Sequence, residues 1–256
     1  MHDFQPAKKA LGQNFLHDQQ VIERIVAAIS PKPDDIVIEI GPGRGALTNL
    51  LLASACHLHV IEYDYALADY WQLESERRGN LTVHQGNVLK MDFNSIVPQK
   101  TIKVIGNLPY NISSQILINL LTATHLKDSV VMLQLEMVDR IVAEPNNKTY
   151  GRLSVMLQQH FYCDRLFKVP SGAFNPAPKV DSAILRLTPK DVKNQLESPE
   201  RFAKIVKTAF AQRRKTLRNN LKKILTSEQI QSVDIDPNLR AENLSVDDFI
   251  RLSSIV

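Results

Sequence analysis

The stretch Asn107-Leu108-Pro109-Tyr110 follows a short β-branched run and combines an amide, a rigid ring and an aromatic side chain. The side-chain oxygen of Asn107 and a backbone carbonyl at Leu108 or Pro109 can accept the two hydrogens of a nucleobase amine. Pro109 stiffens the loop, and Tyr110 can stack on a planar ring. Such an amine is a poor nucleophile that needs positioning more than a strong base. The tetrapeptide could also be a capped turn, which is the commoner use of such residues.

A glycine-rich stretch, Glu39-Ile40-Gly41-Pro42-Gly43-Arg44-Gly45, follows the first β-branched run and precedes a helical pattern. Glycines at such a turn let the backbone approach a ligand closely. Glu62 ends the second run, about twenty residues later, where a carboxylate can accept hydrogen bonds from both hydroxyls of a ribose. The stretch therefore predicts a nucleoside site, although its spacing also satisfies the dinucleotide fingerprint of a nicotinamide-dependent reductase.

Two residues of this stretch favour a sulfonium cofactor over a dinucleotide. Glu39 adds a carboxylate beside the glycines, and Pro42 removes a backbone N–H where a diphosphate would need donors. Because acid suits the positive charge of S-adenosylmethionine, we expect that cofactor here. The less specific interpretation is an ordinary strand-to-helix turn, with Glu39 and Glu62 as strand-end charges that face water.

A basic run near the C-terminus could contact a phosphate backbone. A methyltransferase that acts on a base within RNA needs such a surface, and its binding would weaken steeply with salt. Basic helical stretches are also common on solvated surfaces, and the net charge of +4 alone selects no partner. Six residues within one expected helical stretch form the predicted RNA-binding set: Arg213, Arg214, Lys215, Arg218, Lys222 and Lys223.

The remaining reactive side chains indicate neither a metal site nor a disulfide framework. Cys56 and Cys163 are far apart, and the seven histidines form no cluster with ligand spacing. We therefore expect a reducing, cytoplasmic location. No stretch approaches the roughly 18 apolar residues that would span a membrane. Trp71 is expected to pack in the core.

These candidate sites lie at the ends of short apolar runs that alternate with helical patterns. Parallel, doubly wound α/β sheets have this rhythm and bind ligands at the carboxyl ends of their strands. Two later runs are joined by a segment too short for a crossover helix, which predicts an antiparallel hairpin at the sheet edge. The expected strands are Ile36–Ile40, Leu58–Ile61, Leu81–His84, Lys103–Ile105, Val130–Leu133, Leu166–Val169 and Ala183–Leu187.

Helical patterns flank these strands and dominate the C-terminal part of the chain. We expect Asp18 to cap a helix that ends at Ser30, and Ser113 to cap a helix through Leu121. Further helices are expected at Pro199–Phe210, Thr216–Leu225, Ser227–Val233 and Val246–Val256. The length of 256 residues accommodates a catalytic α/β domain over 1–189 and a small helical domain over 190–256.

Taken in order, the motifs resemble the ribosomal RNA adenine dimethylase family over nearly the whole chain. The resemblance implies a Rossmann-like class I methyltransferase sheet, mostly parallel with an antiparallel edge hairpin. It further implies transfer of four methyl groups from S-adenosylmethionine to two adjacent adenosines near the 3′ end of small-subunit rRNA, within the pre-small ribosomal subunit. We expect a monomer. The matching stretches are Gly12–Leu16, Glu39–Gly45, Asn107–Tyr110, Tyr150–Ser154, Phe174–Ser182, Gln212–Thr216 and Arg240–Glu242.

The resemblance also implies a role for each residue that matches a family motif. Asn107 would contact both the cofactor and the target amine, and Leu108 and Pro109 belong to the same catalytic motif. Tyr110 and Phe174 would lie on the two faces of the target adenine. Cofactor contacts are implied for Asn14 and Leu16 at the entrance, Gly41 on the methionine side and Glu62 at the ribose.

One position departs from the family pattern. Where the family usually has an aspartate that contacts the adenine amine of the cofactor, this chain has Asn87. Asparagine can still accept that hydrogen bond, but a charge-assisted bond is roughly twice as strong as a neutral one. We therefore expect Asn87→Asp to bind S-adenosylmethionine at least as tightly as the native chain does in calorimetry, and weaker binding would contradict this.

Two further functions compete with small-subunit methylation. A related methyltransferase that modifies one large-subunit rRNA adenine and confers antibiotic resistance shares the glycine loop and the Asn-Leu-Pro-Tyr type of motif. The stretch Arg240-Ala241-Glu242-Asn243-Leu244 argues against it. A non-catalytic ribosome-assembly factor could keep this fold as a scaffold, but the intact Asn107–Tyr110 motif favours catalysis.

Overall fold

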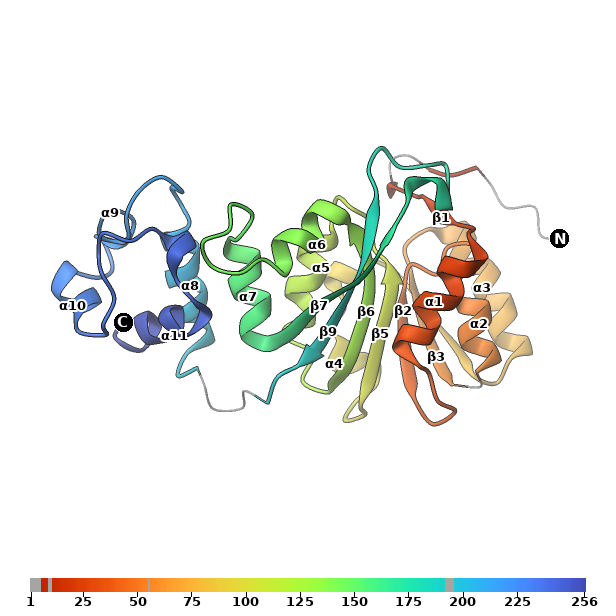
Figure 1. The fold of residues 1–256 in the computed structure, drawn as a ribbon. Helices are drawn as coiled ribbons and strands as arrows, with labels where there is room; N and C mark the ends of the chain where they lie inside the picture. Colours follow the sequence, from red (N-terminus) through yellow and green to blue (C-terminus); the bar gives the residue numbers. More distant parts are fainter. Residues whose placement is uncertain (1–5, 9–10, 55, 192–195) are drawn as a thin grey trace. The chain divides into compact units, whose positions relative to one another are not determined.

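The computed structural model describes residues 6–8, 11–54, 56–191 and 196–256. It contains a seven-stranded sheet in the order β4-β3-β2-β5-β6-β9-β7 (Figure 1). The pairs among β2 to β6 are parallel, and β9 runs antiparallel to β6, which confirms the predicted sheet and its antiparallel edge. The strands are β2 (Ile36–Ile40), β3 (His57–Glu62), β4 (Leu81–Gln85), β5 (Ile102–Asn107), β6 (Leu126–Gln134), β7 (Phe161–Val169) and β9 (Ser182–Pro189).

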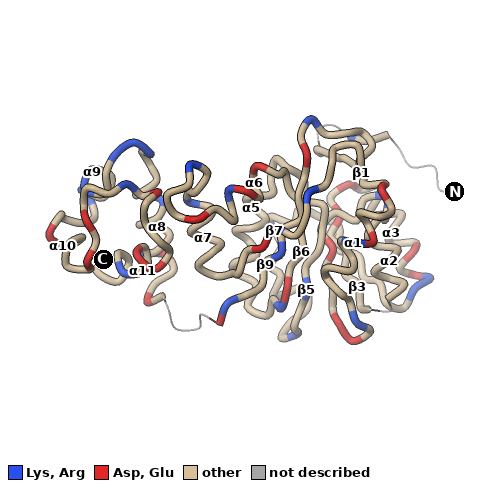
Figure 2. The backbone as a smooth tube through the Cα atoms, viewed as in Figure 1, with Lys and Arg blue, Asp and Glu red and all other residues tan. Residues whose placement is uncertain are grey.

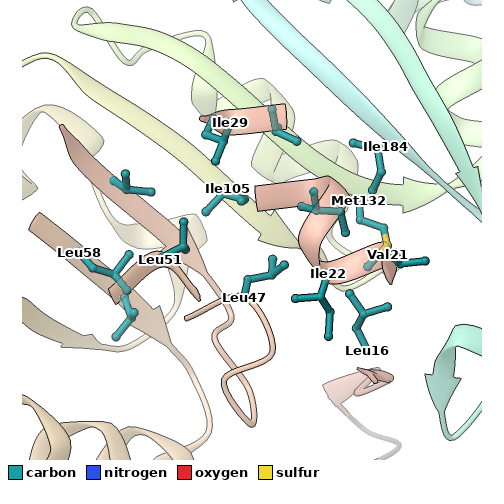
Figure 3. Packing of buried hydrophobic residues seen from close by; sticks show 14 of the residues in the cluster. Leu16, Val21, Ile22, Ile29, Leu47, Leu51, Leu58, Ile105, Met132 and Ile184 are labelled. Carbon is teal, nitrogen blue, oxygen red and sulfur yellow. The ribbon is translucent and has the colours of Figure 1, made fainter. Parts of the chain in front are cut away.

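Three helices pack their apolar side chains against one face of the sheet: α1 (Gln19–Ile29), α2 (Thr48–Ala53) and α3 (Tyr65–Arg77). Figure 3 shows Val21 and Ile22 of α1 near Met132 and Ile184 of the strands. Asp18 caps α1 as predicted, because its side chain accepts the Val21 N–H at 3.1 Å. This packing fixes the helices that flank the strand ends.

Short elements complete the sheet unit around the strand ends. They are η2 (Val88–Lys90), α4 (Phe93–Ile96), α5 (Ser113–Leu120), η3 (Ser171–Ala173) and the paired two-residue strands β1 (Phe15–Leu16) and β8 (Phe174–Asn175). The prediction that Ser113 caps α5 is wrong. Ile112 occupies the cap position without a side-chain bond, and the Ser113 hydroxyl donates to the Tyr110 carbonyl at 3.1 Å. Ser113 therefore fastens the preceding loop instead.

The chain divides into two compact units, one of residues 1–138 and 164–189, the other of residues 139–163 and 190–256. The C-terminal domain predicted over 190–256 therefore lacks residues 139–163, which belong to the same unit in the structure. The reason is packing: α7 (Arg152–His160) contacts α8 (Pro199–Ala209) and α11 (Val246–Ser254), and Tyr150 lies edge-on to Phe210. The other elements there are α9 (Leu217–Leu221), α10 (Ser227–Gln231) and η4 (Ala241–Asn243), and α6 (Leu135–Ile141) spans the division.

None of the helices in the described ranges is long and apolar enough to cross a membrane.

Candidate active site

A cavity of about 390 Å³ lies where β2, β3, β4 and β5 end at their carboxyl edge. Its wall includes the last residues of these strands, the loops that follow them and the N-terminal residues 11–16. This is the edge at which parallel sheets bind ligands. The structure brings nine of the predicted site residues to this cavity: Asn14, Leu16, Gly41, Glu62, Asn87, Asn107, Leu108, Pro109 and Tyr110.

The glycine loop contains glycines with left-handed backbone conformations, which residues other than glycine rarely adopt. Gly41 has a φ of +70°, and a Cβ there would meet no atom within 4 Å, so its open side faces the cavity. Gly45 has a φ of +89°, and a Cβ there would come within 2.7 Å of the Trp71 ring. The Trp71 indole donates to the Gly43 carbonyl at 2.9 Å. Trp71, expected only to pack in the core, also holds the loop in place.

Glu62 ends β3 with its carboxylate bound to the surrounding backbone. One oxygen accepts the Gly43 N–H at 3.2 Å, and the other accepts the Asp64 N–H at 2.8 Å. Burial raises the pKa of Glu62, and these backbone hydrogen bonds oppose the rise. Each carboxylate oxygen has a second lone pair, so the group can still accept from ribose hydroxyls.

Glu39 brings a second carboxylate into the cavity wall and is only 1% exposed. Its Oε2 atom has no hydrogen-bond partner within the described part of the chain. Burial raises the pKa of Glu39 to about 8. A hydrogen bond from Thr48 opposes this rise, and the negative charge of the neighbouring Glu62 adds to it. A buried carboxylate without a cation is costly, so a positively charged ligand group fits this wall. The residues present therefore suit a nucleoside that carries a cationic sulfur.

Asn107 ends β5 with its amide held by the N-terminal segment. Its Nδ2 donates to the Asn14 carbonyl at 2.9 Å, so the amide nitrogen is turned towards Asn14. The acceptor oxygen is thereby left for another donor at the cavity. The next peptide is also fixed, because the Leu108 N–H donates to the Met132 carbonyl at 3.1 Å.

The two predicted aromatic contacts have different surroundings. Tyr110 lines the cavity, and its hydroxyl lies 2.7 Å from the Ser182 hydroxyl. Burial raises the pKa of Tyr110, so the ring stays neutral at physiological pH. Phe174 is 3% exposed, packs in the core and is not among the cavity-lining residues. The structure does not bring Phe174 to the cavity, and its contact with the target base stays a prediction that needs its ring to turn outward.

The six basic residues do not lie on one helix, so that part of the prediction is wrong. Helix α9 covers only Leu217–Leu221, and the loop before it carries three of the six side chains. Asn220 stabilises this loop by donating to the carbonyls of Ala209 and Gln212 at 2.7 and 3.1 Å. Figure 2 shows Lys and Arg gathered along the loop between α8 and α9.

Arg213 differs from the other five basic residues because it is tied to the protein. Its guanidinium pairs with Glu242 at 2.9 Å and also donates to the Lys148 carbonyl. Arg213 therefore joins three segments of its own unit. The other five, Arg214, Lys215, Arg218, Lys222 and Lys223, are exposed.

The mostly parallel sheet with its antiparallel strand β9, the glycine loop and the acidic ends of β2 and β3 define a class I methyltransferase. A model of the family described as ribosomal RNA adenine dimethylase matches residues 4–256. The chain belongs to this family, and its cofactor is S-adenosylmethionine. The nicotinamide-dependent alternative is thereby excluded.

Individual relatives agree with the family assignment. The chain is 49% identical to the ribosomal RNA small subunit methyltransferase A of Francisella tularensis subsp. novicida, over 98% of this chain and 97% of that protein. A dimethyladenosine transferase structure from Plasmodium falciparum matches with a TM-score of 0.79 and 26% identity, covering 93% of this chain and 95% of that one. The structure of the 23S rRNA methyltransferase ErmE matches with a TM-score of 0.72 and 27% identity, covering 94% and 99%.

Proposed function

We propose that this protein dimethylates the N6 amines of two adjacent adenosines near the 3′ end of small-subunit rRNA. It acts as a cytoplasmic monomer on the pre-small ribosomal subunit. The chemistry is supported by one observation: the Asn107 amide is held by the Asn14 carbonyl, and both Asn107 and the glycine loop line the cavity. The choice of small-subunit rRNA is supported by the relative of 49% identity, whose name specifies that subunit.

The bound cofactor supplies an electrophilic methyl group, and the chain's own residues position the amine. Asn107 Oδ1 accepts one amine hydrogen. The carbonyl of Leu108 or Pro109 accepts the other. The Pro109 oxygen also accepts the Ile112 N–H at 3.2 Å and keeps a second lone pair. Two acceptors turn the amine lone pair out of conjugation and aim it. Tyr110 stacks on the base, and water takes the proton that the methylated amine releases, so no strong base is required.

We expect the affinity for S-adenosylmethionine to rise with pH through the pKa of Glu39, about 8. The protonated acid predominates below that pH, and only the carboxylate attracts a cation, so binding must release a proton. The rise approaches tenfold per pH unit for one linked proton. Calorimetry between pH 6 and 9 measures it, and Glu39→Gln should abolish the slope. An equal slope in Glu39→Gln would contradict a role for this carboxylate.

The exposed basic residues of the α8–α9 loop and α9 are expected to contact the RNA backbone. Replacing Arg214, Lys215 and Arg218 with alanine should weaken RNA binding and lower the slope of log affinity against log salt by about 0.7 to 0.9 per lost phosphate contact. Arg213 stays intact in this variant because it holds its own unit together. Cofactor affinity should be unchanged. An unaltered salt slope would remove these residues from the RNA surface.

Reverse transcription distinguishes the two candidate rRNA substrates. Two methyl groups on N6 block Watson–Crick pairing, so a dimethylated adenosine stops primer extension. After incubation with unmodified small and large subunits, we expect stops at two adjacent adenosines near the 3′ end of the small-subunit rRNA alone. The second candidate substrate is large-subunit rRNA, and its basis is the 27% identity to the 23S rRNA methyltransferase ErmE. For that substrate, the stop would occur in large-subunit rRNA.

A further inference from the structure

The N-terminal segment, residues 11–16, forms one wall of the cofactor cavity. At its C-terminal end the segment is held by backbone bonds. Strand β1 pairs with β8, and the His17 N–H donates to the Ala173 carbonyl at 2.9 Å. The position of the other end depends on side chains.

The Asp64 carboxylate accepts hydrogen bonds from those side chains, which are Lys8 and Gln13. Lys8 Nζ donates to one carboxylate oxygen of Asp64 at 2.7 Å, and Gln13 Nε2 donates to the other at 3.0 Å. Gln13 in turn accepts the Lys8 N–H at 2.8 Å, so the two residues and Asp64 form a closed set of hydrogen bonds. A charge-assisted pair of this kind is stronger than a neutral hydrogen bond.

Asp64 is itself part of the rigid frame. Its side chain is only 3% exposed and accepts the Ala66 N–H at the start of α3. Its backbone N–H donates to the carboxylate of Glu62, two residues earlier. Burial alone would raise the pKa of Asp64, but the hydrogen bonds from Lys8 and Gln13, the charge of Lys8 and the Ala66 N–H together lower that pKa. The carboxylate is therefore charged when it holds the segment.

The segment carries a backbone carbonyl that holds the catalytic amide. Asn14 directly follows Gln13, and its carbonyl accepts Asn107 Nδ2 at 2.9 Å. We propose that Asp64 is a positioning residue for methyl transfer, which through Lys8 and Gln13 keeps the Asn14 carbonyl where it orients Asn107. This inference rests on the proposed role of Asn107. Displacement of the segment frees the amide to rotate, which removes its acceptor oxygen from the target amine.

The test compares Asp64→Asn with Asp35→Asn in single-turnover methyl transfer at saturating cofactor and RNA. Asp64→Asn keeps an acceptor for the α3 cap and loses the charge that holds Lys8. Asp35 is a matched control, because its carboxylate also pairs with a lysine, Lys103 at 2.6 Å, before β2 begins and away from the cavity. We expect transfer to fall on the order of tenfold in Asp64→Asn and to stay near the native rate in Asp35→Asn.

A double-mutant cycle with Asn107→Asp separates positioning from a general loss of structure. An aspartate at 107 cannot donate to Asn14, so Asp64→Asn should slow transfer no further in that background. Multiplicative effects, or a native rate in Asp64→Asn alone, would overturn the inference while leaving the proposed function intact. A native rate in Asn107→Asp would also overturn the inference, because the aspartate keeps acceptor oxygens without the hydrogen bond to Asn14. The proposed role of Asn107 itself would be overturned only by a native rate in Asn107→Ala.

A spectroscopic measurement covers variants whose transfer is too slow to follow. The Asn107 side-chain amide signals can be assigned in ¹⁵N spectra by their absence in Asn107→Ala. The hydrogen-bonded amide proton should shift towards its solvent-exposed position in Asp64→Asn and not in Asp35→Asn. Unmoved signals in Asp64→Asn would contradict the inference.

Discussion

Asn107→Ala should lower the rate of methyl transfer at least about a hundredfold, because it removes the acceptor that holds and polarises the target amine. Cofactor affinity should fall much less, since Glu39, Glu62 and the glycine loop are untouched. The loss is then in the transition state more than in cofactor binding. Single-turnover transfer to unmodified small subunits, with calorimetry of S-adenosylmethionine binding, measures both quantities.

Asn80→Ala is the matched control for this substitution. The Asn80 amide also donates to a backbone carbonyl, that of Cys56 at 3.0 Å, at the start of β3 and away from the cavity. We expect Asn80→Ala to change stability only, with native transfer from the folded protein. An Asn107→Ala variant that transfers methyl groups at the native rate would remove Asn107 from the chemistry.

Gly106→Ala should destabilise the protein by about 3 kcal/mol, because the added methyl group has no room within the sheet. A Cβ at Gly106 would lie 2.6 Å from the Ile40 carbonyl oxygen, and these two residues are register partners of β5 and β2. A backbone atom in the middle of a sheet cannot move aside without disturbing both strands. Since β2 leads into the glycine loop and β5 into Asn107, methyl transfer should fall as well. Denaturant unfolding measures the loss of stability.

Gly79→Ala provides the comparison for that substitution. A Cβ at Gly79 would meet no atom within 4 Å, and its φ is not in the left-handed region. The free energy of unfolding should therefore change by no more than about 0.5 kcal/mol, as at most surface positions. Equal stability of the two variants would contradict the close packing of β2 against β5.

The sheet could be predicted from sequence because each buried parallel strand is a short β-branched run between helical patterns. The predicted strands lie within the observed ones, and Asp18 caps α1 as expected. The grouping of α7 with the C-terminal helices could not be predicted, because it depends on contacts such as Tyr150 with Phe210 across 60 residues of sequence. The predicted cap of α5 is wrong because the Ser113 hydroxyl donates a hydrogen bond to the preceding loop, at the Tyr110 carbonyl.

Within the site, residues in local motifs were found and those that act through long-range contacts were missed. Glu39, Glu62 and Asn107 stand at strand ends, where parallel topology gathers them at one edge. Trp71 and Asp64 gave no local signal, because their partners, Gly43 and Lys8, are distant in sequence. The same limit applies to Arg213, whose pairing with Glu242 no local pattern indicates.

The most direct measurement is transfer of labelled methyl groups from S-adenosylmethionine to unmodified small ribosomal subunits, followed by nucleoside analysis of the digested rRNA. The native protein should yield N6,N6-dimethyladenosine, and Asn107→Ala should yield next to none while it still binds the cofactor. No transfer by a folded native protein that binds S-adenosylmethionine would contradict the proposed substrate and favour large-subunit rRNA, then a non-catalytic role in assembly.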